Sequence, residues 1–238
     1  MKKKTKIILI VIASLLVCLV AAGAVYFGTY YKAQNVEASL SGDSAVQVSR
    51  IDSGYFFDGQ GTQSALIFYP GAKVACEAYA PLMHELADRG IDCFLVEMPL
   101  NFAIFDVNRA QTIMHSYTYE KWLLAGHSLG GAMAAEFAAE HKEELAGLCL
   151  LAAYSTKDLS DADFPLAVIY GSEDTVVNKE KIEAGRALAP ADYREIEISG
   201  GNHAGFASYG AQSGDGKATI SEEQQRAQTV AAILALLK

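Results

Sequence analysis

The feature that most constrains the fold of this 238-residue chain is the pentapeptide GHSLG at residues 126–130. An apolar run, WLLA, leads into it, and residues 131–141 (GAMAAEFAAEH) follow it with the composition of a helix. The pattern predicts a strand, a sharp turn and a helix, and only glycine fits on both sides of such a turn. The turn would lift the hydroxyl of Ser128 above the sheet, toward the first N–H groups and the positive dipole end of the helix.

The chain after residue 45 alternates short apolar runs with longer amphipathic segments. The short runs predict strands at 46–50, 54–58, 65–69, 93–98, 122–125, 148–152, 166–170 and 194–198. The amphipathic segments predict helices at 78–89, 107–115, 131–141 and 180–188, and one final helix near the C-terminus. Strands that alternate with helices predict an α/β fold, with a mainly parallel sheet covered by helices on both faces.

Two helix ends carry recognisable signals. Gly90 follows the helix predicted at 78–89, at the position that a C-cap glycine occupies. Ser221 and Gln224 match a capping box that would open the final helix. The core-facing side chains of that helix are predicted to be Val230, Ile233, Leu234 and Leu237.

The N-terminal region contains no charged residue between Lys6 and Lys32, an uncharged stretch of 25 residues. About 20 apolar residues suffice for a helix to cross a bilayer. Four lysines precede the stretch and a single one follows it, which favours a cytoplasmic N-terminus. We therefore expect a membrane anchor over residues 1–32, a polar linker over 33–45 and one domain over 46–238. The protein would be a single-pass protein of the cell membrane with its domain outside the cytoplasm.

A cleavable signal peptide is the alternative for this region, with Ala22-Gly23-Ala24 as the cleavage site. The apolar stretch is longer than a usual signal-peptide core, which favours the uncleaved anchor. If the segment is cleaved, the domain would be secreted.

The charge of the chain excludes one class of partner. Five of its 19 basic residues precede Glu37, so the remaining 14 stand against 28 acidic residues and the net charge of that part is −14. Such a surface repels a phosphate backbone, and we expect no nucleic acid partner. The four cysteines show no metal-binding or disulfide spacing and are predicted to be free thiols.

A serine hydroxyl needs a base to take its proton, and His203 is the candidate. It lies in the loop after the last predicted strand, whereas His84, His115 and His141 lie in helix-like segments and His127 lies in the turn beside Ser128. Asp174 follows the strand at 166–170 and could orient the imidazole of His203, with Glu173 as its nearest rival. The order serine, acid, histidine distinguishes one class of serine hydrolase from the others.

An oxyanion would need two preorganised N–H donors. The backbone N–H of Leu129, directly after the serine, is the first candidate. The second should come from the turn after the strand at 65–69, where Pro70 has no N–H and Gly71 permits a tight bend. We choose Ala72 as this donor, with Lys73 as the second choice.

The segments GHSLGG, GSEDTVV and GGNHAGF resemble the α/β-hydrolase superfamily, and the resemblance covers most of the chain after about residue 50. Within the superfamily the chain is similar to the compact, cap-less members near the dienelactone hydrolases. It departs from them in two places. Pro70-Gly71 stands where many relatives have His-Gly, and Ser128 stands where dienelactone hydrolases carry a cysteine nucleophile.

These observations predict a serine hydrolase that cleaves an ester-like bond of a small-molecule acyl substrate through an acyl-enzyme. The expected catalytic residues are Ser128, Asp174 and His203, and the possible substrate contacts are Lys73, Asn101 and Tyr154. We expect neither a metal nor an organic cofactor, and we attribute Asp215 to an Asp-Gly turn. Two alternatives use the same fold: an acyltransferase of the cell envelope with the same three residues, and a non-catalytic binding module.

Overall fold

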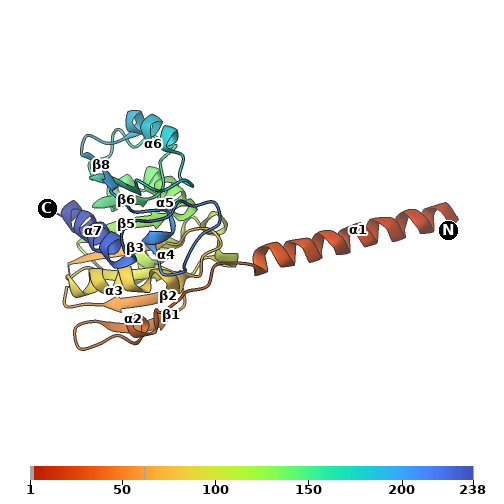
Figure 1. Cartoon of the computed structure of the whole chain (residues 1–238), viewed down its shortest axis with the longest axis horizontal. Coiled ribbons are helices and arrows are strands. Elements are labelled where there is room, and N and C mark those ends of the chain that lie inside the picture. The colour runs from red at the N-terminus through yellow and green to blue at the C-terminus, as the bar shows by residue number, and fades with distance from the viewer. Residues whose placement is uncertain (1–2, 62, 238) are drawn as a thin grey trace.

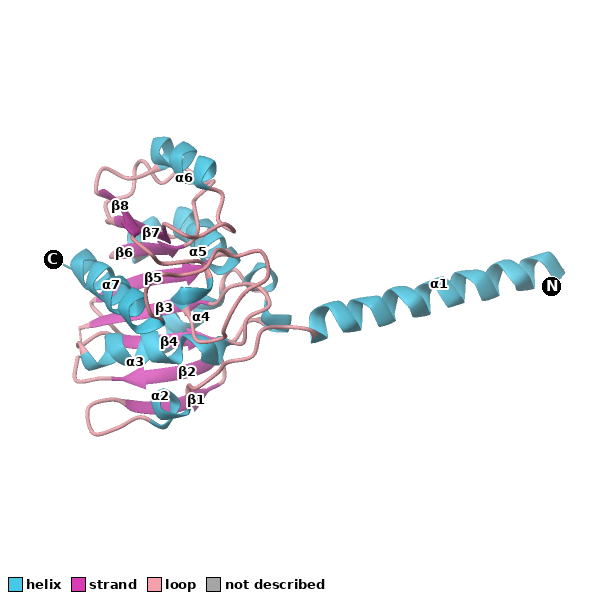
Figure 2. Cartoon of the chain, in the orientation of Figure 1, coloured by secondary structure: helices cyan, strands magenta, loops and turns pink. Residues whose placement is uncertain are grey.

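An eight-stranded sheet in the order β1-β2-β4-β3-β5-β6-β7-β8 is the centre of the computed structural model, which describes residues 3–61 and 63–237 (Figures 1 and 2). The strands are β1 Gln47–Ile51, β2 Gly54–Asp58, β3 Ser64–Tyr69, β4 Asp92–Val96, β5 Lys121–His127, β6 Gly147–Leu151, β7 Leu166–Gly171 and β8 Tyr193–Ile198. β1 pairs with β2, and β2 with β4, in antiparallel register, and the six strands from β4 to β8 in the sheet order pair in parallel. The mainly parallel sheet predicted from the sequence is confirmed.

Helices cover both faces of the sheet, which explains why its inner strands are apolar on both sides. The helices of the domain are α2 Glu37–Ser41, α3 Ala80–Asp88, α4 Arg109–Ser116, α5 Leu129–Glu140, α6 Lys179–Gly185 and α7 Glu222–Leu234. In β3, Leu66 and Phe68 point into the core shared with α3 and α7, whereas Ile67 and Tyr69 point into the core shared with α4 and α5. All four side chains are fully buried.

The helix predicted at 78–89 is in fact a 3-10 turn at Cys76–Tyr79 followed by α3, because Pro81 favours a helix start in the first turn. Gly90 has φ 88° and ends this segment as predicted. The capping box of Ser221 and Gln224 is also present. After α7 the chain tightens into a 3-10 turn over Ala235–Leu237, which buries Leu236 as well, while the predicted Leu234 and Leu237 pack partly buried against the core.

The cysteines of the folded domain are buried thiols. Cys93 lies in β4 and Cys149 in β6, as expected for small apolar side chains, and Cys76 begins a 3-10 turn. Burial raises the pKa of all three thiols. They therefore stay protonated near neutral pH and are poor nucleophiles.

The N-terminal helix α1, Lys3–Gly28, projects away from the domain, as Figure 1 shows. Its segment Leu9–Gly28 has a mean hydropathy of 2.7 and is not buried in the protein, and aromatic side chains near its C-terminal end contact the domain. By length and composition this helix could cross a membrane. Lys2, one of the four lysines that precede the apolar stretch, lies outside the described residues.

The segment 33–45, which we predicted as a linker, packs on the domain instead. It contains α2, and Val36 is 5% exposed within the core beside α3. The backbone N–H of Gln34 donates to the carbonyl of Ser208 over 2.8 Å. The segment is therefore not a separate linker, because Val36 is buried in the core and Ala33, Leu40 and Ala45 pack partly buried against it.

We expect Ser221→Ala to lower the free energy of unfolding by about 1 kcal/mol, because α7 loses its N-cap and Gln224 loses the partner of its backbone N–H. Urea denaturation of the full chain in detergent measures the change. Ser213→Ala is the control, since Ser213 is exposed and its hydroxyl makes no hydrogen bond with the described residues. Equal stability of the two variants would contradict the role of the cap.

Candidate active site

Ser128 occupies the sharp turn between β5 and α5 that the sequence predicts. Its backbone has φ 53° and ψ −123°, a conformation that costs a non-glycine residue about 1–3 kcal/mol. The backbone N–H of Ser128 donates to the carbonyl of Leu151 in β6 over 2.9 Å, which helps to hold this conformation. Ser128 therefore stands at the carboxyl edge of the sheet, at the N-terminus of a 12-residue helix.

Close backbone contacts explain the glycines around Ser128. A Cβ on Gly126 would lie 2.6 Å from the carbonyl carbon of Gly130, within the turn itself. A Cβ on Gly130 would lie 2.2 Å from the carbonyl oxygen of Tyr69 and 2.3 Å from that of Pro70. All three distances are too short for a Cβ atom, so no residue other than glycine fits at either position. The start of α5 is thus pressed against the end of β3, which brings the turn that follows β3 close to Ser128.

Asp174 and His203 form a buried pair. Nδ1 of His203 lies 2.9 Å from Oδ2 of Asp174, and the two residues are 2% and 3% exposed. Asp174 follows β7 and His203 follows β8, so the parallel strands bring residues 29 positions apart to the same edge. Glu173, the rival acid, is exposed and accepts a hydrogen bond from Ser172 instead.

The surroundings of Asp174 favour its charged form. Burial alone would raise the pKa of this carboxyl group, but the hydrogen bond from His203 and those from the backbone N–H groups of Val177 and Val176 outweigh it and lower the pKa. Asp174 is therefore a carboxylate held in place by three donors, which suits an acceptor for Nδ1–H of His203.

Ser128 and His203 line the same pocket, which has a volume of about 250 Å³. Among the described residues no hydrogen bond joins the Ser128 hydroxyl to His203, a contact that often tightens only when substrate binds. Apolar side chains and one amide complete the lining, which consists of Leu129, Ala132, Ala152, Ala153, Tyr154, Val176, Val177 and Asn178. Sequence reasoning singled out Leu129 and Tyr154 but missed the others, which lie in the first turn of α5 and in the segments after β6 and β7.

The turn after β3 offers one unpaired backbone donor near Ser128. The N–H of Gly71 donates to the hydroxyl of Tyr79 over 3.0 Å, and that of Lys73 donates to the carbonyl of Asn101 over 2.9 Å. Within the described part of the chain, the N–H groups of Ala72 and Leu129 have no acceptor. These two donors are the ones that the sequence singled out.

Two of the predicted substrate contacts lie elsewhere. Lys73 does not line the pocket, since its ammonium group lies 4.3 Å from the ring centroid of Tyr26 at the end of α1. Asn101 does not line it either, and has φ 58° in the loop after β4. Their loops pack against the end of α1, where Lys73 contacts Tyr26 and Phe102 contacts Phe27, and the contact of Lys73 and Asn101 with a substrate stays a prediction.

Two residues that sequence reasoning missed hold the loop that carries His203. The carboxylate of Asp215, interpreted above as part of a turn only, accepts from the backbone N–H groups of His203 over 3.3 Å and Ala204 over 2.8 Å. The amide of Gln225 in α7 is 1% exposed and bonds both the N–H and the carbonyl of Asn202. Gln225 lies one turn before Thr229 and two turns before Ile233 on the core-facing side of α7, and a glutamine on that buried face was the signal that could have identified it.

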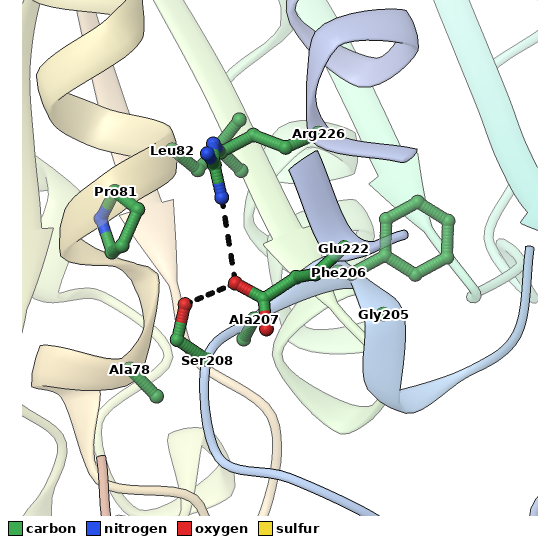
Figure 3. A pocket seen from close by; sticks show the side chains of 9 residues that line it. All are labelled: Ala78, Pro81, Leu82, Gly205, Phe206, Ala207, Ser208, Glu222 and Arg226. Carbon is green, nitrogen blue, oxygen red and sulfur yellow. Dashed lines mark hydrogen bonds and ion pairs between the residues drawn. The ribbon is translucent and has the colours of Figure 1, made fainter. Parts of the chain in front are cut away.

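The loop that carries His203 is also connected to α7, at Ser208, and through α7 to α3. Figure 3 shows Glu222 between Ser208 and Arg226, and it accepts a hydrogen bond from each. Arg226 also pairs with Glu85 of α3 over 3.1 Å. The hollow that these residues surround has a volume of about 10 Å³, room for one water molecule at most. This hollow is therefore too small for a second ligand site, and the hydrogen bonds around it connect the loop to α3 and α7.

His127 links the turn of Ser128 to the turn after β3. Its Nδ1 lies 2.8 Å from the hydroxyl of Tyr79, which in turn accepts from the N–H of Gly71. His127 is fully enclosed, its ring centroid lies 4.5 Å from that of His203, and its Nε2 has no partner among the described residues. Burial, and then the nearby charge of His203, hold the pKa of His127 well below its usual range. The buried imidazole is therefore neutral.

This neutral His127 predicts a pH-dependent stability. Its pKa is lowered in the folded state, so unfolding takes up a proton below about pH 6.5 and stability is lost as the pH falls below that value. We expect the advantage of the wild type over His127→Asn to shrink between pH 7 and 5, by up to about 1.4 kcal/mol per pH unit. Urea denaturation at several pH values measures it, with the exposed His115→Asn as control. An advantage that does not change with pH would contradict the neutral assignment.

Comparisons with known proteins agree with this architecture. A profile described as the alpha/beta hydrolase family matches residues 65–227. Among solved structures, TT1662 from Thermus thermophilus (TM-score 0.56, 16% identity) and a CIB-like hydrolase from Thermoplasma acidophilum (TM-score 0.58, 14% identity) are similar in fold. Each similarity covers 81% of this chain, together with 98% of the first structure and 99% of the second.

One curated protein is similar in sequence, a candidate non-heme haloperoxidase from Mycobacterium phage D29 that is 27% identical over 111 residues. The match spans 42% of this chain and only 40% of that relative. The family profile, by contrast, covers more than half of the chain and includes Ser128, Asp174 and His203. The chain belongs to the alpha/beta hydrolase family.

Proposed function

We propose that the protein is a serine hydrolase that cleaves an ester-like bond, with Ser128 as nucleophile, His203 as general base and acid, and Asp174 as the group that orients His203. The hydrogen bond of 2.9 Å between Asp174 and His203, behind a pocket that Ser128 and His203 both line, is the observation that carries this proposal. A carboxylate on Nδ1 leaves Nε2 of the imidazole free to accept the serine proton.

The reaction would proceed in two halves. Oγ of Ser128 forms a bond to the acyl carbon while its proton passes to His203, and the bond from the acyl carbon to the alcohol oxygen breaks. His203 returns the proton to the departing alcohol, which leaves an acyl-enzyme. A water molecule then gives a proton to His203 and attacks the same carbon, so that the acid leaves and Ser128 recovers its proton.

The negative charge that develops on the acyl oxygen needs donors in fixed positions. We assign this role to the N–H groups of Leu129 and Ala72. The support is that the other two N–H groups of the turn after β3, those of Gly71 and Lys73, already have acceptors. Tyr79 would act as a positioning residue, since its hydroxyl fixes Gly71 directly before Ala72.

We further propose that α1 anchors the domain in the cell membrane with the active site outside the cytoplasm. The support is the apolar length of Leu9–Gly28 and the excess of lysines before it. Tyr26 and Tyr30 lie where aromatic side chains meet the headgroup region of a bilayer.

A fluorophosphonate probe, which phosphonylates activated serines, tests the catalytic assignment. We expect the full chain to be labelled, and Ser128→Ala to lose all labelling because the only activated hydroxyl is gone. His203→Gln should reduce the labelling rate by about a thousandfold or more, since a serine without its base is a weak nucleophile. In-gel fluorescence against time measures the rates.

Ser213→Ala is the control and should be labelled like the wild type, since Ser213 lies on the exposed part of the loop that follows the site. Labelling that persists in Ser128→Ala, or a wild type that is not labelled at all, would overturn the assignment.

A further inference from the structure

We infer that the carboxyl edge of the sheet rests on the membrane surface, and that the substrate of the Ser128 site is an acyl ester of a lipid in that same bilayer. The inference rests on the proposed function, which supplies the hydrolytic chemistry and the anchor. Beyond the proposed function, it states where the active site lies relative to the membrane and which class of substrate can reach it.

The described residues of the domain expose their large apolar side chains mainly at one edge of the sheet. Outside α1, the large apolar side chains that the described residues expose belong to the stretch after α1, the loop after β4 and the loop after β7: Tyr30, Leu100, Ile104, Phe105 and Val176. The carboxyl ends of the parallel strands meet at this edge, and Val176 lines the Ser128 pocket itself. Apolar side chains gathered around a site in this way mark a surface that meets a membrane or another apolar partner.

The tether between α1 and the domain is too short for the domain to stand away from the bilayer. The apolar span ends at Gly28, and Tyr31 is already fixed to the turn after β3. The N–H of Tyr31 donates to the carbonyl of Lys73 over 2.7 Å, and its carbonyl accepts from Ala75 over 2.9 Å. Only two residues separate the span from this pairing, which is about 7 Å of extended chain.

Aromatic contacts fix the direction in which α1 leaves. The ring of Phe27 lies 5.6 Å from that of Phe102 and 6.0 Å from that of Phe105, and Tyr26 stacks on Phe102 at 6.2 Å. Lys73 lies over the ring of Tyr26 on the same side. Figure 1 shows α1 leaving from the side of the domain opposite the C-terminus. A helix that crosses the bilayer therefore holds the loop after β4 at the lipid surface.

The pocket fits a lipid substrate of which only a part enters the protein. Its lining is mainly apolar, and about 250 Å³ is below the volume of a site that encloses a whole drug-sized molecule. An acyl ester could place its carbonyl at Ser128 and a short length of chain among Ala132, Ala153 and Val177. The remainder would stay in the bilayer beside the exposed side chains of the rim.

Fluorescence quenching tests the position of the edge without reference to activity. Ile104→Trp places an indole on the proposed membrane face, and Ala187→Trp places one at an exposed position just before β8, at the opposite edge. In vesicles of phosphatidylcholine brominated on its acyl chains, we expect strong quenching for Ile104→Trp over the buried Trp122 background and none for Ala187→Trp. Equal quenching of the two variants would overturn the inference.

Activity tests the substrate class. The full chain in vesicles is given a water-soluble p-nitrophenyl butyrate or a fluorogenic diacyl phospholipid. In the double variant Leu100→Asn and Ile104→Gln, we expect unchanged cleavage of the soluble ester and at least about a tenfold loss with the phospholipid, because two apolar contacts with the bilayer are removed. The control Ala187→Gln should cleave both substrates like the wild type.

The outcomes separate this inference from the proposed function. A wild type that cleaves the soluble ester through Ser128 but not the phospholipid would overturn the lipid substrate and leave the hydrolase in place. An equal loss with both substrates in the double variant would also overturn it. If neither ester is cleaved, the proposed function fails and the lipid substrate fails with it, whereas quenching still decides where the edge lies.

Discussion

The site depends above all on the hydrogen bond between Asp174 and His203. Three donors keep Asp174 a carboxylate in a buried position, and the carboxylate in turn fixes which nitrogen of His203 faces the pocket. Burial of either side chain without the other would cost more, because Nδ1 of His203 would lose its partner and Asp174 would lose one of its three donors. The parallel order of β7 and β8 makes the pair possible, since both loops begin at the same edge.

The surrounding structure is built to keep this edge rigid. Gly130 lets α5 approach the end of β3 closely, and Gly126 leaves room for the tight turn in which Ser128 takes a strained conformation. Gln225 and Asp215 hold the loop of His203 through hydrogen bonds to its backbone, and neither lines the Ser128 pocket. If Ser128 is the nucleophile and His203 the base, as we propose, their fixed positions are the preorganised arrangement that nucleophilic catalysis requires.

The sequence predicted the parts of the fold that local patterns control, and missed those that depend on packing. The strands, the capping box at Ser221 and the order Ser128, Asp174, His203 follow from short-range periodicity and turn chemistry, and the observed elements agree with them. Lys73 was assigned to the substrate because its charge was visible but its partner Tyr26 was not. The supports Gln225 and Asp215, like the docked segment 33–45, act through contacts that no local pattern displays.

The central claim is that these three residues build a covalent acyl-enzyme, and mass spectrometry of the protein quenched in acid during turnover of a p-nitrophenyl ester tests it most directly. We expect a peptide containing Ser128 that carries the mass of the acyl group, and we expect Asp174→Asn to accumulate this species far more slowly. Steady turnover with no acylated peptide, or an acyl group on a different residue, would contradict it.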